Sequence, residues 1–82
     1  MIKIKHNLTI NDNGFVFDPV TGESYTLNPV GLEMLRKLDS GQSKEEIKLF
    51  YLDNYDMDKW SFEKAYLDFT ALLDKNHLIS HD

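Results

Sequence analysis

Two turn-forming segments in the first 22 residues restrict the fold more than any other feature of the sequence. Residues 11–14 (NDNG) combine residue types that tolerate positive φ, and residues 18–22 (DPVTG) join a proline to a closing glycine. Tight turns connect neighbouring antiparallel strands. The three segments that these turns separate are therefore predicted to form an antiparallel meander.

Each of the three segments has a strand-like pattern. Residues 2–10 carry apolar side chains at every even position except His6, which predicts one strand with a single buried face. Residues 15–17 (FVF) give a short second strand. Residues 23–27 (ESYTL) are rich in β-favouring types, and Tyr25 and Leu27 are expected to face the core.

Three capping signals then predict three helices. Asn28 is a good N-cap and precedes a proline, Ser43 and Glu46 form a capping box, and Asp58 can cap a third helix that runs to about Lys75. The apolar stripes expected to face the core are Leu32, Leu35 and Leu38, then Ile47, Phe50 and Tyr51, then Phe62, Tyr66, Phe69 and Leu73. Leu78 and Ile79 are expected to fold back onto the core. The order βββααα predicts one α+β domain over residues 1–82, with three helices covering one face of a small sheet.

Composition excludes several classes of function. The chain has no cysteine, which removes disulfides, thiolate metal sites and cysteine nucleophiles. A net charge of −5 argues against a nucleic-acid partner, which requires a basic face. His77 and His81 are four residues apart but lack further ligands, so no metal is expected. With no phosphate-binding loop, nucleophile motif, signal segment or apolar span, we expect a cytoplasmic protein that is not an enzyme, needs no cofactor and does not contact membranes.

The order and spacing of these signals resemble a known family. The run DPVTGESYTLNPVGLEMLRKLDSGQSKEEI, together with the later KNHLI, is similar to the PqqD family of pyrroloquinoline quinone biosynthesis and related recognition elements for ribosomally made, modified peptides. The resemblance covers roughly residues 8–79. It implies a winged-helix-like fold and a non-catalytic peptide chaperone. Such a protein binds the leader segment of a precursor peptide and presents it to a separate modifying enzyme, often a radical S-adenosylmethionine enzyme.

The resemblance also implies where the peptide binds. The leader would add as a strand beside residues 23–27, in a groove walled by the third helix. Physical reasoning supports this place, since the third strand of a meander is an edge with unpaired backbone groups. Ser24 and Thr26 are expected to act chiefly through their backbones. The candidate site residues are Glu23, Ser24, Tyr25, Thr26 and Leu27 on the strand, and Trp60, Lys64 and Leu67 on the helix.

Three positions depart from the family pattern and lie on or beside the predicted groove wall. The third helix ends on Asn76-His77 where the family often has glycine. Ala65 stands near a position that is commonly polar or acidic, and Trp60 lies where charged residues are usual. The ligand is therefore expected to differ from that of better-known members. Trp60 could alternatively cap the end of a small core.

Two other functions remain open from the sequence. A winged-helix DNA-binding regulator would use the third helix, but that helix carries three lysines (59, 64, 75) against four acids (58, 63, 68, 74), a net charge of −1. A protein-docking subunit without a leader peptide is the other alternative. The chain is expected to be a monomer or a weak homodimer that pairs exposed edges.

Overall fold

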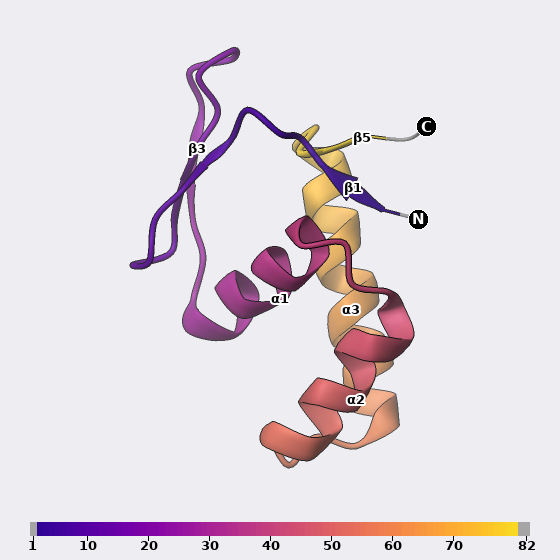
Figure 1. Cartoon of the computed structure of the whole chain (residues 1–82). Helices are drawn as coiled ribbons and strands as arrows, with labels where there is room; N and C mark the ends of the chain where they lie inside the picture. Colours follow the sequence, from indigo (N-terminus) through magenta and orange to yellow (C-terminus); the bar gives the residue numbers. More distant parts are fainter. Residues whose placement is uncertain (1, 81–82) are drawn as a thin grey trace.

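The computed structural model describes residues 2–80 and contains two sheets and three helices. The elements are β1 (Lys3–Ile4), β2 (Thr9–Ile10), β3 (Phe15–Phe17), β4 (Ser24–Thr26), α1 (Pro29–Asp39), α2 (Lys44–Asn54), α3 (Lys59–Lys75) and β5 (Ile79–Ser80). The strands β2, β3 and β4 form an antiparallel sheet in that order, and the helices follow (Figure 1). The predicted three-stranded meander followed by three helices is confirmed.

The first predicted strand is divided in the structure. Only β2 joins the three-stranded sheet, while β1 pairs antiparallel with β5 and sets Ile4 opposite Ile79. The N–H of Lys5 extends this pairing by donating a 3.0 Å bond to the carbonyl of Leu78. A single strand over residues 2–10 is therefore wrong, because its first part finds a partner at the other end of the chain. The same pairing confirms that the C-terminal segment folds back, with Leu78 buried.

The two predicted turns close as their residue types require. Gly14 (φ 92°) and Gly22 (φ 78°) both adopt positive φ. At Gly14 a Cβ would collide with the carbonyl oxygen of Leu27, whose N–H donates a 2.8 Å bond to the carbonyl of Gly14. Only glycine lets the first turn contact the end of β4 this closely.

The three helix starts follow the predicted caps. The side chain of Asn28 accepts a 2.8 Å bond from the N–H of Gly31, and that of Asp58 accepts a 2.7 Å bond from Ser61. Ser43 forms the full capping box at α2. These bonds satisfy backbone donors that a helix start otherwise leaves unpaired, so they fix where each helix begins.

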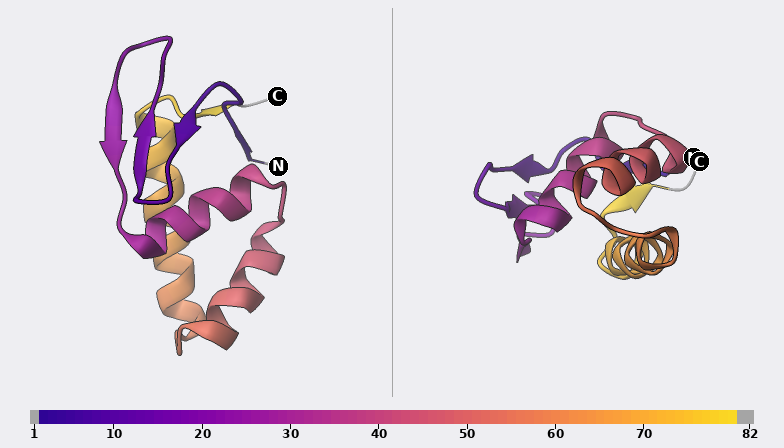
Figure 2. Two further views of the ribbon diagram at one scale, coloured as in Figure 1. Left: turned by 60° about the vertical axis from the view of Figure 1, so that its left-hand side comes forward. Right: turned by 90° about the horizontal axis from the view of Figure 1, so that it is seen from below.

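The core lies between the helices and the inner face of the sheet. Its buried apolar side chains are Ile4, Val16, Met34, Leu35, Leu38, Ile47, Tyr51, Phe62, Leu73 and Leu78. Tyr66 and Phe69 of the predicted α3 stripe are only half-buried, and Met34 was not in the predicted α1 stripe. Figure 2 shows α1 crossing one end of the sheet, with α3 behind it.

One buried ion pair ties the N-terminal segment to the hairpin. Asp18 is 1% exposed and accepts a 3.0 Å bond from Nζ of Lys5. This bond holds the pKa of Asp18 below its usual value of 3.8. The other carboxylate oxygen accepts a bond from the N–H of Val20. The carboxylate thereby stabilises the β3–β4 turn from inside.

Candidate functional site

The strand β4 has a free backbone edge. Among the described residues it pairs only with β3, and Figure 2 shows it as the outermost strand of the sheet. The carbonyl of Glu23 accepts a 2.9 Å bond from the N–H that follows β3, and the N–H of Leu27 donates a 2.8 Å bond to the carbonyl that precedes β3. Backbone direction alternates in antiparallel pairs. Ser24 and Thr26 therefore direct two N–H donors and two carbonyl acceptors away from β3.

The side chains of this segment divide between the two faces of the sheet. Tyr25 and Leu27 are half-buried against the core, while Ser24 and Thr26 are exposed. The hydroxyl of Tyr25 donates a 2.6 Å bond to Oε2 of Glu23, which raises the pKa of Tyr25. This arrangement agrees with the expectation that Ser24 and Thr26 offer chiefly their backbones.

An apolar cleft of about 300 Å³ opens where β4 ends. It lies between the start of α1 and the middle of α3, and its lining residues are Asn28, Val30, Gly31, Met34, Ala65, Asp68, Phe69 and Leu72. Val30 and Leu72 keep 37% and 46% of their surface exposed at its walls. A Cβ on Gly31 would lie 3.4 Å from Cε1 of Phe69, so α1 and α3 pack closely at this point. The cleft begins at Asn28, two residues after the end of β4.

The three predicted α3 residues lie together, but in a different hollow. Trp60, Lys64 and Leu67 line a space of about 450 Å³ with Lys44, Glu63, Tyr66 and Thr70. At roughly 100° per helical residue, this set and the cleft-lining set occupy different sides of α3, and the 2.8 Å pair of Lys64 with Asp68 joins their borders. The structure thus brings the predicted helix residues together without placing them among the residues that line the cleft.

Sequence reasoning missed most of the cleft wall on α3. Asp68 and Leu72 were not singled out, Phe69 was assigned to the core, and Ala65 was noted only as a departure from the family pattern. One signal was available, because residues 65, 68, 69 and 72 follow the i, i+3, i+4, i+7 spacing of a single helix face.

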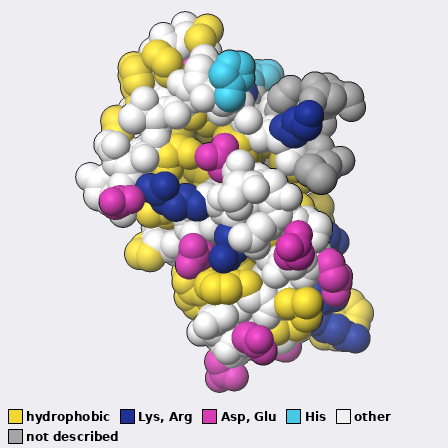
Figure 3. Space-filling model, viewed as in Figure 1, with side chains coloured by type: hydrophobic (Ala, Val, Ile, Leu, Met, Phe, Trp, Pro, Cys, Tyr) yellow, Lys and Arg dark blue, Asp and Glu magenta, His cyan; other side chains and the backbone are white. Residues whose placement is uncertain are grey.

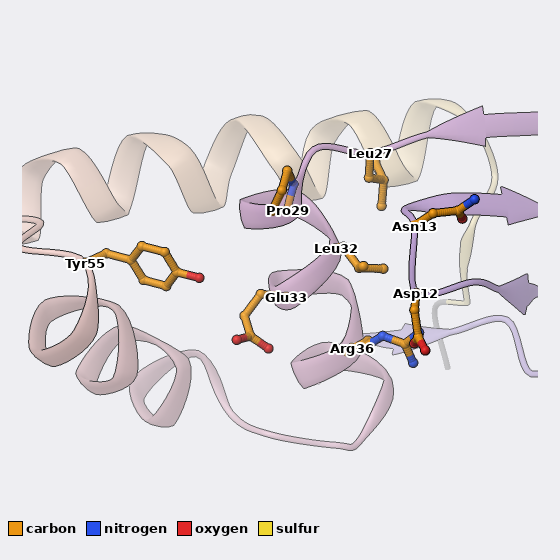
Figure 4. A pocket seen from close by; sticks show the side chains of 8 residues that line it. All are labelled: Asp12, Asn13, Leu27, Pro29, Leu32, Glu33, Arg36 and Tyr55. Atoms are coloured by element: carbon orange, nitrogen blue, oxygen red, sulfur yellow. The ribbon is translucent and has the colours of Figure 1, made fainter.

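A third hollow, of about 470 Å³, lies on another side of α1 (Figure 4). Tyr55 points toward α1 from the end of α2, and Arg36 lies beside Asp12 in the β2–β3 turn. Nη2 of Arg36 and Oδ1 of Asp12 are 2.8 Å apart. The ion pair of Arg36 and Asp12 thus connects the β2–β3 turn to α1.

Surface charge, possible metal ligands and possible membrane-spanning helices were compared over the described residues. Figure 3 shows acidic and basic side chains interspersed on one face, with apolar patches between them. Residues 2–80 contain no group of three or more His, Cys, Asp or Glu side chains arranged to hold a metal ion. His81, one member of the histidine pair considered from the sequence, lies outside the described residues. Over the same residues, no helix is both long and apolar enough to span a bilayer.

Comparison with known proteins identifies the fold and the family. The solved structure described as TbiB1 in complex with the TbiA(beta) leader peptide matches with a TM-score of 0.85 and 24% sequence identity. The match covers 98% of this chain and 96% of that chain, so the two share the same α+β fold. No curated protein matches the chain. The family model for coenzyme PQQ synthesis protein D (PqqD) matches residues 14–79, and the chain belongs to the PqqD family.

Proposed function

We propose that this chain is a non-catalytic protein that binds the leader segment of a ribosomally made precursor peptide and presents it to a separate modifying enzyme. Family membership supports this role, and the similar structure of TbiB1 contains a leader peptide. The observation that carries the proposal is the free edge of β4, followed two residues later by the apolar cleft between α1 and α3.

Strand addition is the proposed binding mode. An extended peptide beside β4 can exchange up to four hydrogen bonds with the backbones of Ser24 and Thr26. Each such bond contributes about 0.5–1.5 kcal/mol net, whatever the peptide sequence. The backbone bonds of Glu23 and Leu27 hold this strand beside β3. The side chains of Tyr25 and Leu27 pack against the core.

The cleft would supply the sequence preference. A peptide that continues past the end of β4 would place one apolar side chain between Gly31 and Ala65, where the small residues leave room. The contact areas of alternate peptide side chains decide specificity in strand addition. The assignment of Trp60, Lys64 and Leu67 to the peptide groove stays a prediction, which the titration below tests separately.

The modifying enzyme is proposed to be a radical S-adenosylmethionine enzyme. This class is the one that the family resemblance suggests. The precursor and the enzyme would be identified among the genes that neighbour the gene for this chain, as a short reading frame and a longer one. The proposal assigns the chemistry to that enzyme and the peptide binding to this chain.

An amide NMR titration tests the proposal. The ¹⁵N-labelled chain is titrated with the synthetic leader of the neighbouring precursor, and a scrambled leader of the same composition is the control. We expect a Kd on the order of 1 μM, which is about −8 kcal/mol, with shifts clustered at residues 23–28 and 65–72. Shifts confined to other regions, or binding of the scrambled leader with equal affinity, would contradict strand addition at β4. Additional shifts at residues 60, 64 and 67 would support the groove wall predicted from the sequence.

A matched pair of variants tests the cleft. Ala65→Leu places a larger side chain in the cleft, so we expect leader binding to weaken about tenfold, which is about 1.4 kcal/mol. Ala71→Leu adds the same atoms to an exposed position of the same helix and should leave the Kd unchanged. Equal affinities for the two variants would show that the peptide does not enter the cleft.

A further inference from the structure

The outer face of the three-stranded sheet, which points away from the core, carries two aromatic side chains. Val16 is 0% exposed on the inner face, and side chains alternate along a strand, so Phe15 and Phe17 on either side of it point outward. Phe15 keeps 37% of its surface exposed, and Phe17 is half-buried. A sheet face that meets only solvent is usually polar, whereas this face presents two rings.

A small hydroxyl residue separates each of these rings from the free edge of β4. In the register of the sheet, Phe15 lies opposite Thr26, and Phe17 lies opposite Ser24. Opposite residues share one face of a sheet, so Ser24 and Thr26 also point outward, and both are exposed. Thr9 of β2 lies opposite Phe17 on its other side. None of these five side chains carries a charge.

A peptide that adds beside β4 continues both of these cross-strand rows. Its residues opposite Ser24 and Thr26 point to the outer face, and the residue between them points inward. Neighbouring strands are about 4.8 Å apart, so the outward peptide residues lie roughly 10 Å from Phe17 and Phe15, two strands away. A large apolar peptide side chain and a phenylalanine ring together span this distance, because only a serine or a threonine lies between them.

We propose that Phe15 and Phe17 are a second determinant of the leader sequence beside the cleft, an inference that rests on the proposed function. The leader carries large apolar residues, branched or aromatic, opposite Ser24 and Thr26. A charged side chain is disfavoured there, because it would be desolvated against the rings and would find no opposite charge among the outer-face side chains named above. Since the inner side of the same peptide enters the apolar cleft, the bound segment is apolar at consecutive positions, as in a strand that is covered on both faces.

Nuclear Overhauser effects (NOEs) in the complex test the register and the contact together. The unaltered chain, labelled with ¹⁵N and ¹³C, is mixed with the synthetic leader of the neighbouring precursor. Backbone NOEs to Ser24 and Thr26 identify the two leader residues that lie opposite them. We expect both residues to be apolar and their side chains to give NOEs to the rings of Phe15 and Phe17. Polar or charged residues at these positions, or side chains without an NOE to either ring, overturn the proposal.

Variants measure the contribution of the two rings and separate this inference from the proposed function. Phe15→Thr and Phe17→Thr keep a strand-favouring residue, and each should raise the Kd for the leader about threefold. Leu49→Ala removes an exposed apolar side chain from α2 (58% exposed) and should leave the Kd unchanged. Unchanged affinity in both folded phenylalanine variants overturns the role of the rings, while strand addition stands. Absence of leader binding, or of backbone NOEs at Ser24 and Thr26 in the unaltered chain, would instead overturn the proposed function.

Discussion

Replacing Thr26 by proline removes one N–H from the free edge of β4 without removing a bond to β3. The N–H of Thr26 points away from β3, and proline is tolerated on an edge strand when its nitrogen faces solvent. The backbone of Tyr25 points toward β3 instead. Tyr25→Pro therefore removes a ladder bond as well as the half-buried ring. Tyr25→Ala removes the ring alone and is the reference for the effect of the ladder bond.

The magnitude follows from the lost hydrogen bond. Without the N–H of Thr26, a peptide that adds beside β4 loses one bond and leaves its own carbonyl without a partner. This costs about 1–1.5 kcal/mol, which is roughly a five- to twelvefold increase in the Kd for the leader. Isothermal titration with the synthetic leader measures the Kd, and urea denaturation measures the stability. We expect Thr26→Pro to change the free energy of unfolding by no more than about 1 kcal/mol, and Tyr25→Pro to lower it by about 3 kcal/mol more than Tyr25→Ala does.

Two results would refute this reasoning. A folded Thr26→Pro variant that binds the leader as tightly as the unaltered chain would exclude strand addition at the outer edge of β4. Equal stability of Tyr25→Pro and Tyr25→Ala would show that the inward and outward positions of the strand are wrongly assigned. The first result concerns the ligand and the second concerns the fold, so the two errors remain distinguishable.

Three further predictions concern stability. Gly14→Ala should lower the free energy of unfolding by about 2–4 kcal/mol, and Gly22→Ala by about 1 kcal/mol. Both positions have positive φ, but only a Cβ at position 14 meets a carbonyl. Equal urea midpoints for the two variants would contradict this. The lowered pKa of Asp18 means that its contribution is complete above pH 3.8 and is lost as the pH falls through the pKa of the folded state. The unaltered chain should lose stability below pH 4 more steeply than Lys5→Met, and parallel pH profiles would count against the ion pair. His77→Gly should raise the free energy of unfolding by about 0.5–1 kcal/mol, because His77 has φ 58° at the end of α3. The change is measured as a higher melting temperature. An unchanged or lower melting temperature would show that the backbone at position 77 is not strained.

The helix starts could be predicted because capping is local chemistry. Asn28, Ser43 and Asp58 each bond to a backbone N–H three residues ahead, so a short stretch of sequence contains the whole signal. The two glycine turns are equally local. The family resemblance rests on the same signals in the same order, which explains why it identified the fold correctly.

The division of the first strand into β1 and β2 could not be predicted from local signals. Alternating apolar residues show that a segment is extended with one buried face, but they do not name its partner. Ile4 lies opposite Ile79 because Leu78 is buried against the core at the end of α3. That contact joins the two ends of the chain, and no window of a few residues contains both of them.

The rotation of α3 about its axis decides which of its faces borders the end of β4. The sequence pattern could not predict this rotation. Helical spacing correctly grouped Trp60, Lys64 and Leu67, yet it gave no direction for the group. In the structure α1 approaches α3 where Gly31 lies beside the ring of Phe69. This contact turns the face of α3 with Phe69 toward α1 and the end of β4. The same rotation leaves Trp60 and Leu67 exposed on another side of the helix, so packing between distant helices, which no local pattern contains, determines which face of α3 borders the cleft.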